Sequence, residues 1–151
     1  MNKSELTEFI KTLGIECEAR EGRQFAEITV DPSRLHVLAR RVRDHEKTLF
    51  DFLVCITGMD YGQELGVVYH LRSARHGHEM VIKSRTADRQ DPHFDSVTDI
   101  WKTADYLERE VYDLLGIKFT SHPDLRRLFL DKSWGFPLRK DYVDDINIVT
   151  K

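Results

Sequence analysis

The tripeptide Glu108-Arg109-Glu110 contains the residue types that general acid–base catalysis needs. Two carboxylates that converge on one substrate atom can act as general acid and general base. Each step along a helix turns the side chain by about 100°, so Glu108 and Glu110 point apart and do not converge. Arg109 has Asp105 four residues before it and Asp113 four residues after it. This spacing predicts exposed ion pairs along a helix, and no active site.

Metal and cofactor chemistry finds little support in the remaining residues. His76-Gly77-His78 offers two imidazoles without an evident third or fourth ligand, so a small metal-dependent enzyme is the weakest alternative for the function. Cys17 and Cys55, the two cysteines, are too few and too far apart for a zinc site or an iron–sulfur cluster built on thiolates. No nucleophile elbow or phosphate-binding loop occurs. We therefore expect no catalytic residue, no bound metal and no cofactor on this chain.

The last third of the sequence is rich in residues that dominate protein interfaces. The segments 122–130 (HPDLRRLFL) and 134–142 (WGFPLRKDY) combine aromatic side chains, arginines and stiffening prolines. These features predict a docking arm, although composition alone favours equally an arm that packs on its own domain. Basic residues between aromatic ones are also typical of a nucleic-acid-binding or adaptor module. Asp124, Asp131 and Asp141 offset much of that positive charge.

The elements that position these segments follow from hydrophobic periodicity. Helices are predicted from Ser4 to Gly14, after Asp31-Pro32, and from Ser96 or Thr98 to Gly116. Strands are predicted at 15–18 and 24–30, which form a hairpin, and at 49–56, 65–72 and 79–84, with a surface loop at 85–95. The order predicts an α+β fold with a mainly antiparallel sheet covered on one face by helices. We expect an α+β domain at 1–117 and an extended, irregular carboxy-terminal arm at 118–151.

Length and charge limit the class of protein. The chain has 151 residues, 40% of them hydrophobic, which suits one globular domain with a tail. A net charge of −3 disfavours a dedicated nucleic-acid binder. No run reaches the roughly 18 apolar residues that cross a bilayer, and the amino terminus has no signal-peptide pattern. We therefore expect a cytoplasmic location without direct membrane insertion.

Three motifs in the second half of the chain resemble a known family. The segments 108–117 (EREVYDLLGI), 122–127 (HPDLRR) and 137–142 (PLRKDY) resemble the signature region of the C subunit of NADH-quinone oxidoreductase, the respiratory complex I. The motifs occur in the family's order with nearly its spacing, except that Gly135 follows Trp134 directly. The resemblance extends from Trp101 to Tyr142.

The resemblance implies a cofactor-free structural subunit of a proton-translocating complex, located peripherally on the cytoplasmic side of the cell membrane. Its expected partners are the B and D subunits of the complex: B carries an iron–sulfur cluster, and D helps form the quinone site. Related membrane-bound hydrogenases and ferredoxin-linked complexes contain equivalent subunits and stay an alternative. Carried over by position, the residues implied at the partner interface are Arg126, Arg127, Trp134, Phe136, Arg139, Lys140, Asp141 and Tyr142.

Overall fold

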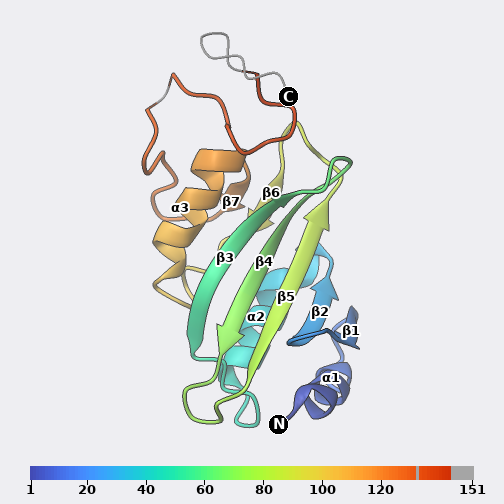
Figure 1. Ribbon diagram of the computed structural model, residues 1–151. Helices are drawn as coiled ribbons and strands as arrows, with labels where there is room; N and C mark the ends of the chain where they lie inside the picture. Colours follow the sequence, from blue (N-terminus) through green and yellow to red (C-terminus); the bar gives the residue numbers. More distant parts are fainter. Residues whose placement is uncertain (132, 144–151) are drawn as a thin grey trace.

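The computed structural model describes residues 1–131 and 133–143; Lys132 and residues 144–151 of the predicted arm lie outside the described part. The helical elements are α1 (Lys3–Lys11), the 3₁₀ turn η1 (Pro32–Arg34), α2 (Leu35–Asp44) and α3 (Ala104–Leu115). The strands are β1 (Cys17–Glu21), β2 (Ala26–Val30), β3 (Phe52–Asp60), β4 (Leu65–Arg72), β5 (Glu79–Thr86), β6 (His93–Asp95) and β7 (Lys118–Thr120). Figure 1 shows their arrangement.

Five strands form one sheet in the order β1-β2-β5-β4-β3. The pairs β1–β2, β3–β4 and β4–β5 are antiparallel. β2 and β5 pair in parallel, with η1, α2, β3 and β4 in the crossover connection between them. The α+β fold with a mainly antiparallel sheet is therefore confirmed, and so is the first hairpin. β3 lies three to four residues later than predicted, because the chain from 45 to 51 is occupied by turns.

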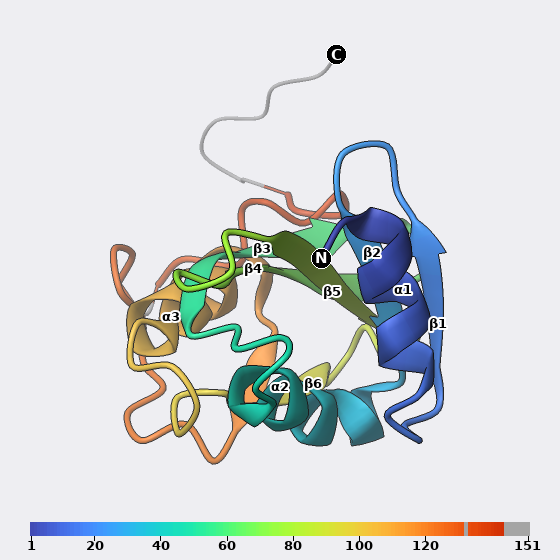
Figure 2. The same cartoon turned by 90° about the horizontal axis from the view of Figure 1, so that it is seen from below.

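The helices cover one face of the sheet, and the core lies between these two layers (Figure 2). Alternate residues of β4 and β5 point into this core, as the two-residue period of a strand requires. Leu65, Val67, Tyr69 and Leu71 from β4 and Met80 and Ile82 from β5 are all at most 1% exposed. At the edge of the sheet α3 comes so close to β3 that Gly58 has no room for a side chain. A Cβ there would overlap Leu115 Cδ1 and lie 2.9 Å from Val111 Cγ1.

Two helix starts differ from the sequence-based prediction. α1 is capped by Asn2, whose side chain accepts from the Glu5 amide, and Ser4 lies inside the helix. α3 starts at Ala104, well after Ser96 and Thr98. The carboxylate of Glu108 binds the Ser96 hydroxyl and the Val97 amide, and so holds this segment in turns instead of helix. The predicted start at Ser96 or Thr98 was therefore wrong.

The segment 85–95 is more ordered than the predicted surface loop. β5 continues to Thr86, and β6 pairs in parallel with β7, burying Phe94 to 1% and Phe119 to 2% exposure. The first residues of the predicted arm thus belong to a two-stranded sheet, and the chain beyond β7 contains turns without further helix or strand among the described residues. The boundary at 117 and 118 between domain and arm stays a prediction.

Candidate functional site

Arg127 anchors the arm to the carboxyl end of α3. Its guanidinium pairs with the carboxylate of Asp113, which is 0% exposed, and donates to the Asp113 carbonyl at 3.0 Å. It also donates to the carbonyls of Trp134 (3.0 Å) and Gly135 (2.9 Å) in the arm. Burial alone raises the pKa of Asp113, but the bonds from Arg127 and two arm amides outweigh burial and lower it. The pair is therefore ionised and joins α3 to the arm.

Arg139 forms a second anchor beside the first. Its Nε donates to the Leu115 carbonyl at 2.5 Å and its Nη1 to the Arg89 carbonyl at 3.0 Å. The ring of Phe136 lies between the two anchors, with its centroid 5.1 Å from the Arg127 guanidinium and 5.5 Å from that of Arg139. Arginines at this position satisfy carbonyls that a helix end leaves unpaired and complement its dipole.

The turn that ends α3 makes room for Phe136. Gly116 adopts a left-handed conformation with φ of 73°, which commonly ends a helix at glycine. A Cβ at Gly116 would lie 2.7 Å from two ring atoms of Phe136. Glycine is therefore required both by the backbone angle and by the aromatic ring against it.

A third anchor fixes the arm to the β3–β4 hairpin. Asp60 forms a two-pronged pair with Arg89, at 2.7 and 2.9 Å, and accepts from the Lys140 amide at 2.9 Å. Its side chain is 3% exposed. The hydrogen bonds from Arg89 hold the pKa of Asp60 far below its usual value. Asp141 adds a looser ion pair to Arg89 at 3.7 Å.

Arg109 also binds the arm, which the sequence-based prediction missed. It is 8% exposed and donates to the carbonyls of Arg126 and Arg127, both at 3.3 Å. The expected ion pairs of Arg109 with Asp105 and Asp113 are wrong, since Asp113 pairs with Arg127 and Asp105 faces His122. Buried carbonyl acceptors from a separate segment were not visible in the helical spacing.

The arm exposes large apolar side chains among its polar ones. These are Phe129 (72%), Trp134 (45%), Leu138 (60%) and Val143 (71%). Of the residues predicted to touch partners, Arg126, Trp134, Lys140 and Asp141 face solvent, whereas Arg127, Phe136 and Arg139 face the domain and Tyr142 is half-buried. The arm therefore does pack on its own domain, through Arg127, Arg139 and Phe136, and presents other large apolar side chains outward. Which of these residues touch a partner stays a prediction.

Glu108, one of the two carboxylates that helical spacing separates, is completely buried. It accepts from the Ser96 hydroxyl at 2.6 Å and from the Val97 amide at 3.0 Å. Burial raises its pKa to about 7, because these two hydrogen bonds do not replace the lost hydration. Glu110 points elsewhere and is half-buried, so the two carboxylates do not form an acid–base pair.

The two histidines of the metal hypothesis are turned toward backbone groups. The rings stack with centroids 5.2 Å apart, and the Nε2 atoms of His76 and His78 lie 2.9 and 2.7 Å from the carbonyls of Glu46 and Thr48. Within residues 1–131 and 133–143, no three His, Cys, Asp or Glu side chains gather as metal ligands. His76 and His78 therefore have a structural role, because their rings bind the backbone of the loop that contains Glu46 and Thr48.

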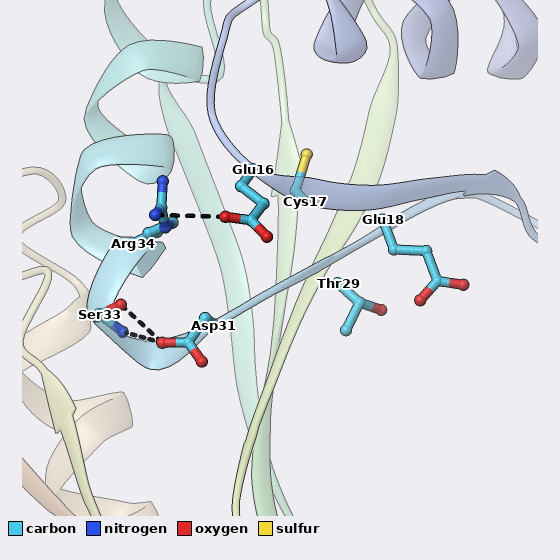
Figure 3. A pocket seen from close by; sticks show the side chains of 7 residues that line it. All are labelled: Glu16, Cys17, Glu18, Thr29, Asp31, Ser33 and Arg34. Atoms are coloured by element: carbon cyan, nitrogen blue, oxygen red, sulfur yellow. Dashed lines mark hydrogen bonds and ion pairs between the residues drawn. The ribbon is translucent and has the colours of Figure 1, made fainter.

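A shallow hollow of about 580 Å³ lies between β1, the end of β2 and η1 (Figure 3). Three of its seven lining residues are acidic, and two of these are already engaged. Asp31 accepts from the Ser33 amide, and Glu16 pairs with Arg34 at 3.3 Å. Burial raises the pKa of the Cys17 thiol and so keeps it protonated. The hollow therefore offers no activated nucleophile and no phosphate-binding loop.

Comparison with known proteins agrees with the three motifs and the fold. Residues 28–145 match the family described as "Respiratory-chain NADH dehydrogenase, 30 Kd subunit". The chain belongs to this family. It is 48% identical over 122 residues to the C/D subunit of NADH-quinone oxidoreductase from Phocaeicola vulgatus, covering 80% of this chain and 23% of that protein. It is 42% identical over 129 residues to the C subunit of the same enzyme from Chlorobium phaeobacteroides, covering 83% of this chain and 76% of that protein.

The fold is also found in a solved respiratory complex. A chain in the structure of the membrane-bound sulfane sulfur reductase, an archaeal respiratory membrane complex, matches 95% of this chain with a TM-score of 0.80 and 23% identity, covering 86% of that chain. In this family's fold, the described residues form no helix long and apolar enough to span a bilayer. The chain spans less than a quarter of the length of the C/D relatives it matches.

Proposed function

We propose that the chain is a structural subunit of a proton-translocating NADH-quinone oxidoreductase of the complex I type, without a cofactor or an active site of its own. In this proposal the chain holds the B subunit, with its iron–sulfur cluster, and the D subunit, at the quinone site, in fixed positions on the cytoplasmic side of the membrane. Electron transfer depends on carriers held at fixed distances, and a rigid brace supplies that geometry.

The observation that carries the proposal is the division of the arm into two surfaces. Arg127 and Arg139 bind the domain, while Phe129, Trp134 and Leu138 face outward. Large apolar side chains of this kind dominate interface hot spots. Because three polar anchors already hold the described arm in place, docking loses little further conformational entropy.

The D subunit as a partner gains support from relatives that bear both letters in their names. The proteins of Phocaeicola vulgatus and Bacteroides fragilis are both named as C/D subunits, and this chain matches 23% of each. A subunit that shares its name with D in relatives is expected to contact D in this complex.

Purification of the native complex through a tag on this chain tests the proposal. Mass spectrometry of the detergent-solubilised complex is expected to identify the B and D subunits, with NADH-driven quinone reduction in the same fraction. The double variant Trp134→Ala, Leu138→Ala should fold normally but recover at least tenfold less of both partners. The control variant Val37→Ala, at an exposed valine of α2, should retain them. A complex that lacks both partners, or that contains hydrogenase subunits in their place, would contradict the proposal.

A further inference from the structure

β3 is the last strand of the five-stranded sheet, and its outer edge is bare. Among the described residues only β4 pairs with it, and no other described group bonds to the backbone of residues 53–59. A free strand edge presents a row of amides and carbonyls that pair readily with another extended chain. Within the described part of the chain, residues 53–59 of β3 therefore present an unpaired strand edge.

The usual protections of an edge strand are largely missing from β3. The sequence Phe52–Asp60 contains no lysine, arginine or proline, and Phe52, Val54 and Met59 are 52, 38 and 38% exposed. A bulge between Leu53 and Cys55 affects one end and leaves the rest of the pairing regular. The opposite edge strand, β1, is by contrast short and has the charged sequence CEARE. Of these two edges, the β3 edge is therefore the one suited to accept another strand.

A cleft of about 200 Å³ opens beside this edge. Its lining residues are Ile56, Thr57, Gly58, Glu110, Val111, Leu114, Leu115 and Leu138. Successive residues of a strand point to opposite faces, so a hollow lined by Ile56, Thr57 and Gly58 lies along the outer edge of β3. The volume is several times the ~30 Å³ that a water occupies in the liquid, which leaves room for an apolar side chain.

Glu110 gives the cleft a negative charge. It is half-buried, and no described side chain pairs with it. Its helical neighbour Arg109 is turned toward the arm carbonyls, and β3 carries no basic residue. A half-buried carboxylate in an otherwise apolar lining favours an occupant that brings a cation.

We propose that the outer edge of β3 accepts an extended segment of a partner subunit as a sixth strand. An apolar side chain of that segment fills the cleft, and a nearby lysine or arginine pairs with Glu110. Strand addition gives affinity through backbone bonds and specificity through the side-chain pocket. The proposal rests on the proposed function, since the strand comes from the complex. Leu138 lines the cleft and belongs to the outward surface of the arm, so the added strand continues the arm's docking surface.

Residue-resolved amide hydrogen exchange tests the added strand directly. The free chain is compared with the same chain in the purified native complex. The outward-facing amides of residues 53–59, at alternate positions, should exchange on the order of tenfold or more slowly in the complex, because each gains a backbone acceptor. Unchanged exchange at all of these amides in an intact complex would overturn the proposal.

Charge reversal tests the side-chain contact. Glu110→Lys should lower the recovery of the partner about tenfold at unchanged thermal stability of the free chain, since it opposes the partner's cation. Glu46→Lys is the matched control, an exposed glutamate in a distant loop that should leave recovery unchanged. Equal recovery with both variants would refute the pairing with Glu110.

The two proposals fail in different ways. If the unaltered chain recovers no partner subunits, the proposed function fails and the added strand with it. If partners are recovered but β3 stays unprotected, only the added strand is wrong. If native mass spectrometry shows a dimer of the isolated chain, with the same amides protected, the sixth strand comes from a second copy of this chain and not from a partner subunit. The β3 amides could already be protected in the free chain and lose this protection in a variant shortened to end at Val143. That result would show that the chain's own residues pair with the edge of β3, and it would overturn the proposal.

Discussion

Replacing Glu108 with glutamine should make the protein more stable at pH 8 and leave it unchanged at pH 4. The folded chain holds the Glu108 proton with a pKa of about 7, against an ordinary value of 4.5. Because the folded state binds this proton more tightly than the unfolded state, stability falls as pH rises from about 4.5 to about 7. The difference of about 2.5 pKa units corresponds to about 3 kcal/mol.

Glutamine reproduces the neutral carboxyl in this site. Its carbonyl can accept from the Val97 amide and its amide can donate to the Ser96 hydroxyl, which lies 2.9 Å from the hydroxyl of Thr98 and can donate there. The hydrogen bonds of the protonated acid are thus preserved, and the cost of a buried negative charge disappears. The variant should gain about 3 kcal/mol at pH 8 through the pKa difference alone.

Urea unfolding at several pH values between 4 and 8 measures this gain. The signal is tryptophan fluorescence, and its buried reporter is Trp101, which is 5% exposed and donates its indole N–H to the Phe50 carbonyl. Other titrating groups, such as His78, affect parent and variant alike and cancel in the difference. Glu110→Gln, on the same helix, is the control for the replacement of a glutamate by glutamine. A constant difference at all pH values, or a Glu108→Gln variant less stable at pH 8, would refute the reasoning.

Three further changes test the packing, the anchors and the docking surface. Gly58→Ala places a Cβ against Leu115 Cδ1 and 2.9 Å from Val111 Cγ1, and should destabilise the fold by about 1–3 kcal/mol, measured by urea unfolding; an unchanged midpoint would show that α3 can move aside. Asp60→Asn removes the ionised partner of Arg89 and should speed tryptic cleavage of the arm without moving the main thermal transition. In the parent this anchor is present above the ordinary pKa of 3.8 and is lost only as pH falls well below it, so acid should release the arm and neutral pH should not. Trp134→Ala should change the stability of the free chain by less than about 0.5 kcal/mol, since the side chain is 45% exposed, yet lower the recovery of partner subunits.

The fold could be predicted largely from local patterns. The alternation of Ala26, Ile28 and Val30 predicts a half-buried strand, and β2 places all three in the core. The Asp31-Pro32 pair predicts a helix start, and Asp31 does cap the turn before α2. Such signals are read from neighbouring residues, so one sequence suffices. The parallel pairing of β2 with β5 depends on a crossover of about fifty residues, and no local pattern encodes it.

The start of α3 shows where local patterns fail. Ser96 and Thr98 are good helix caps by residue type. The structure uses Ser96 to bind Glu108, twelve residues further along, so a long-range contact overrides the local preference. The burial of Glu108 could have been suspected only from its place on the apolar side of the helix, beside Val111, Leu115 and Ala104.

The arm illustrates why composition alone could not separate docking from packing. An arginine that binds a partner and one that binds its own helix end have the same sequence signature. In this chain Arg127 and Arg139 of the arm bind carbonyls that α3 leaves unpaired. Arg109 of α3 in turn donates to a carbonyl of the arm. Polar anchoring has a consequence for docking. Had the arm been attached through Trp134 and Leu138, those side chains would be buried in its own domain. Because Arg127, Arg139 and Phe136 attach it instead, Trp134 and Leu138 stay outside and are available to a second protein.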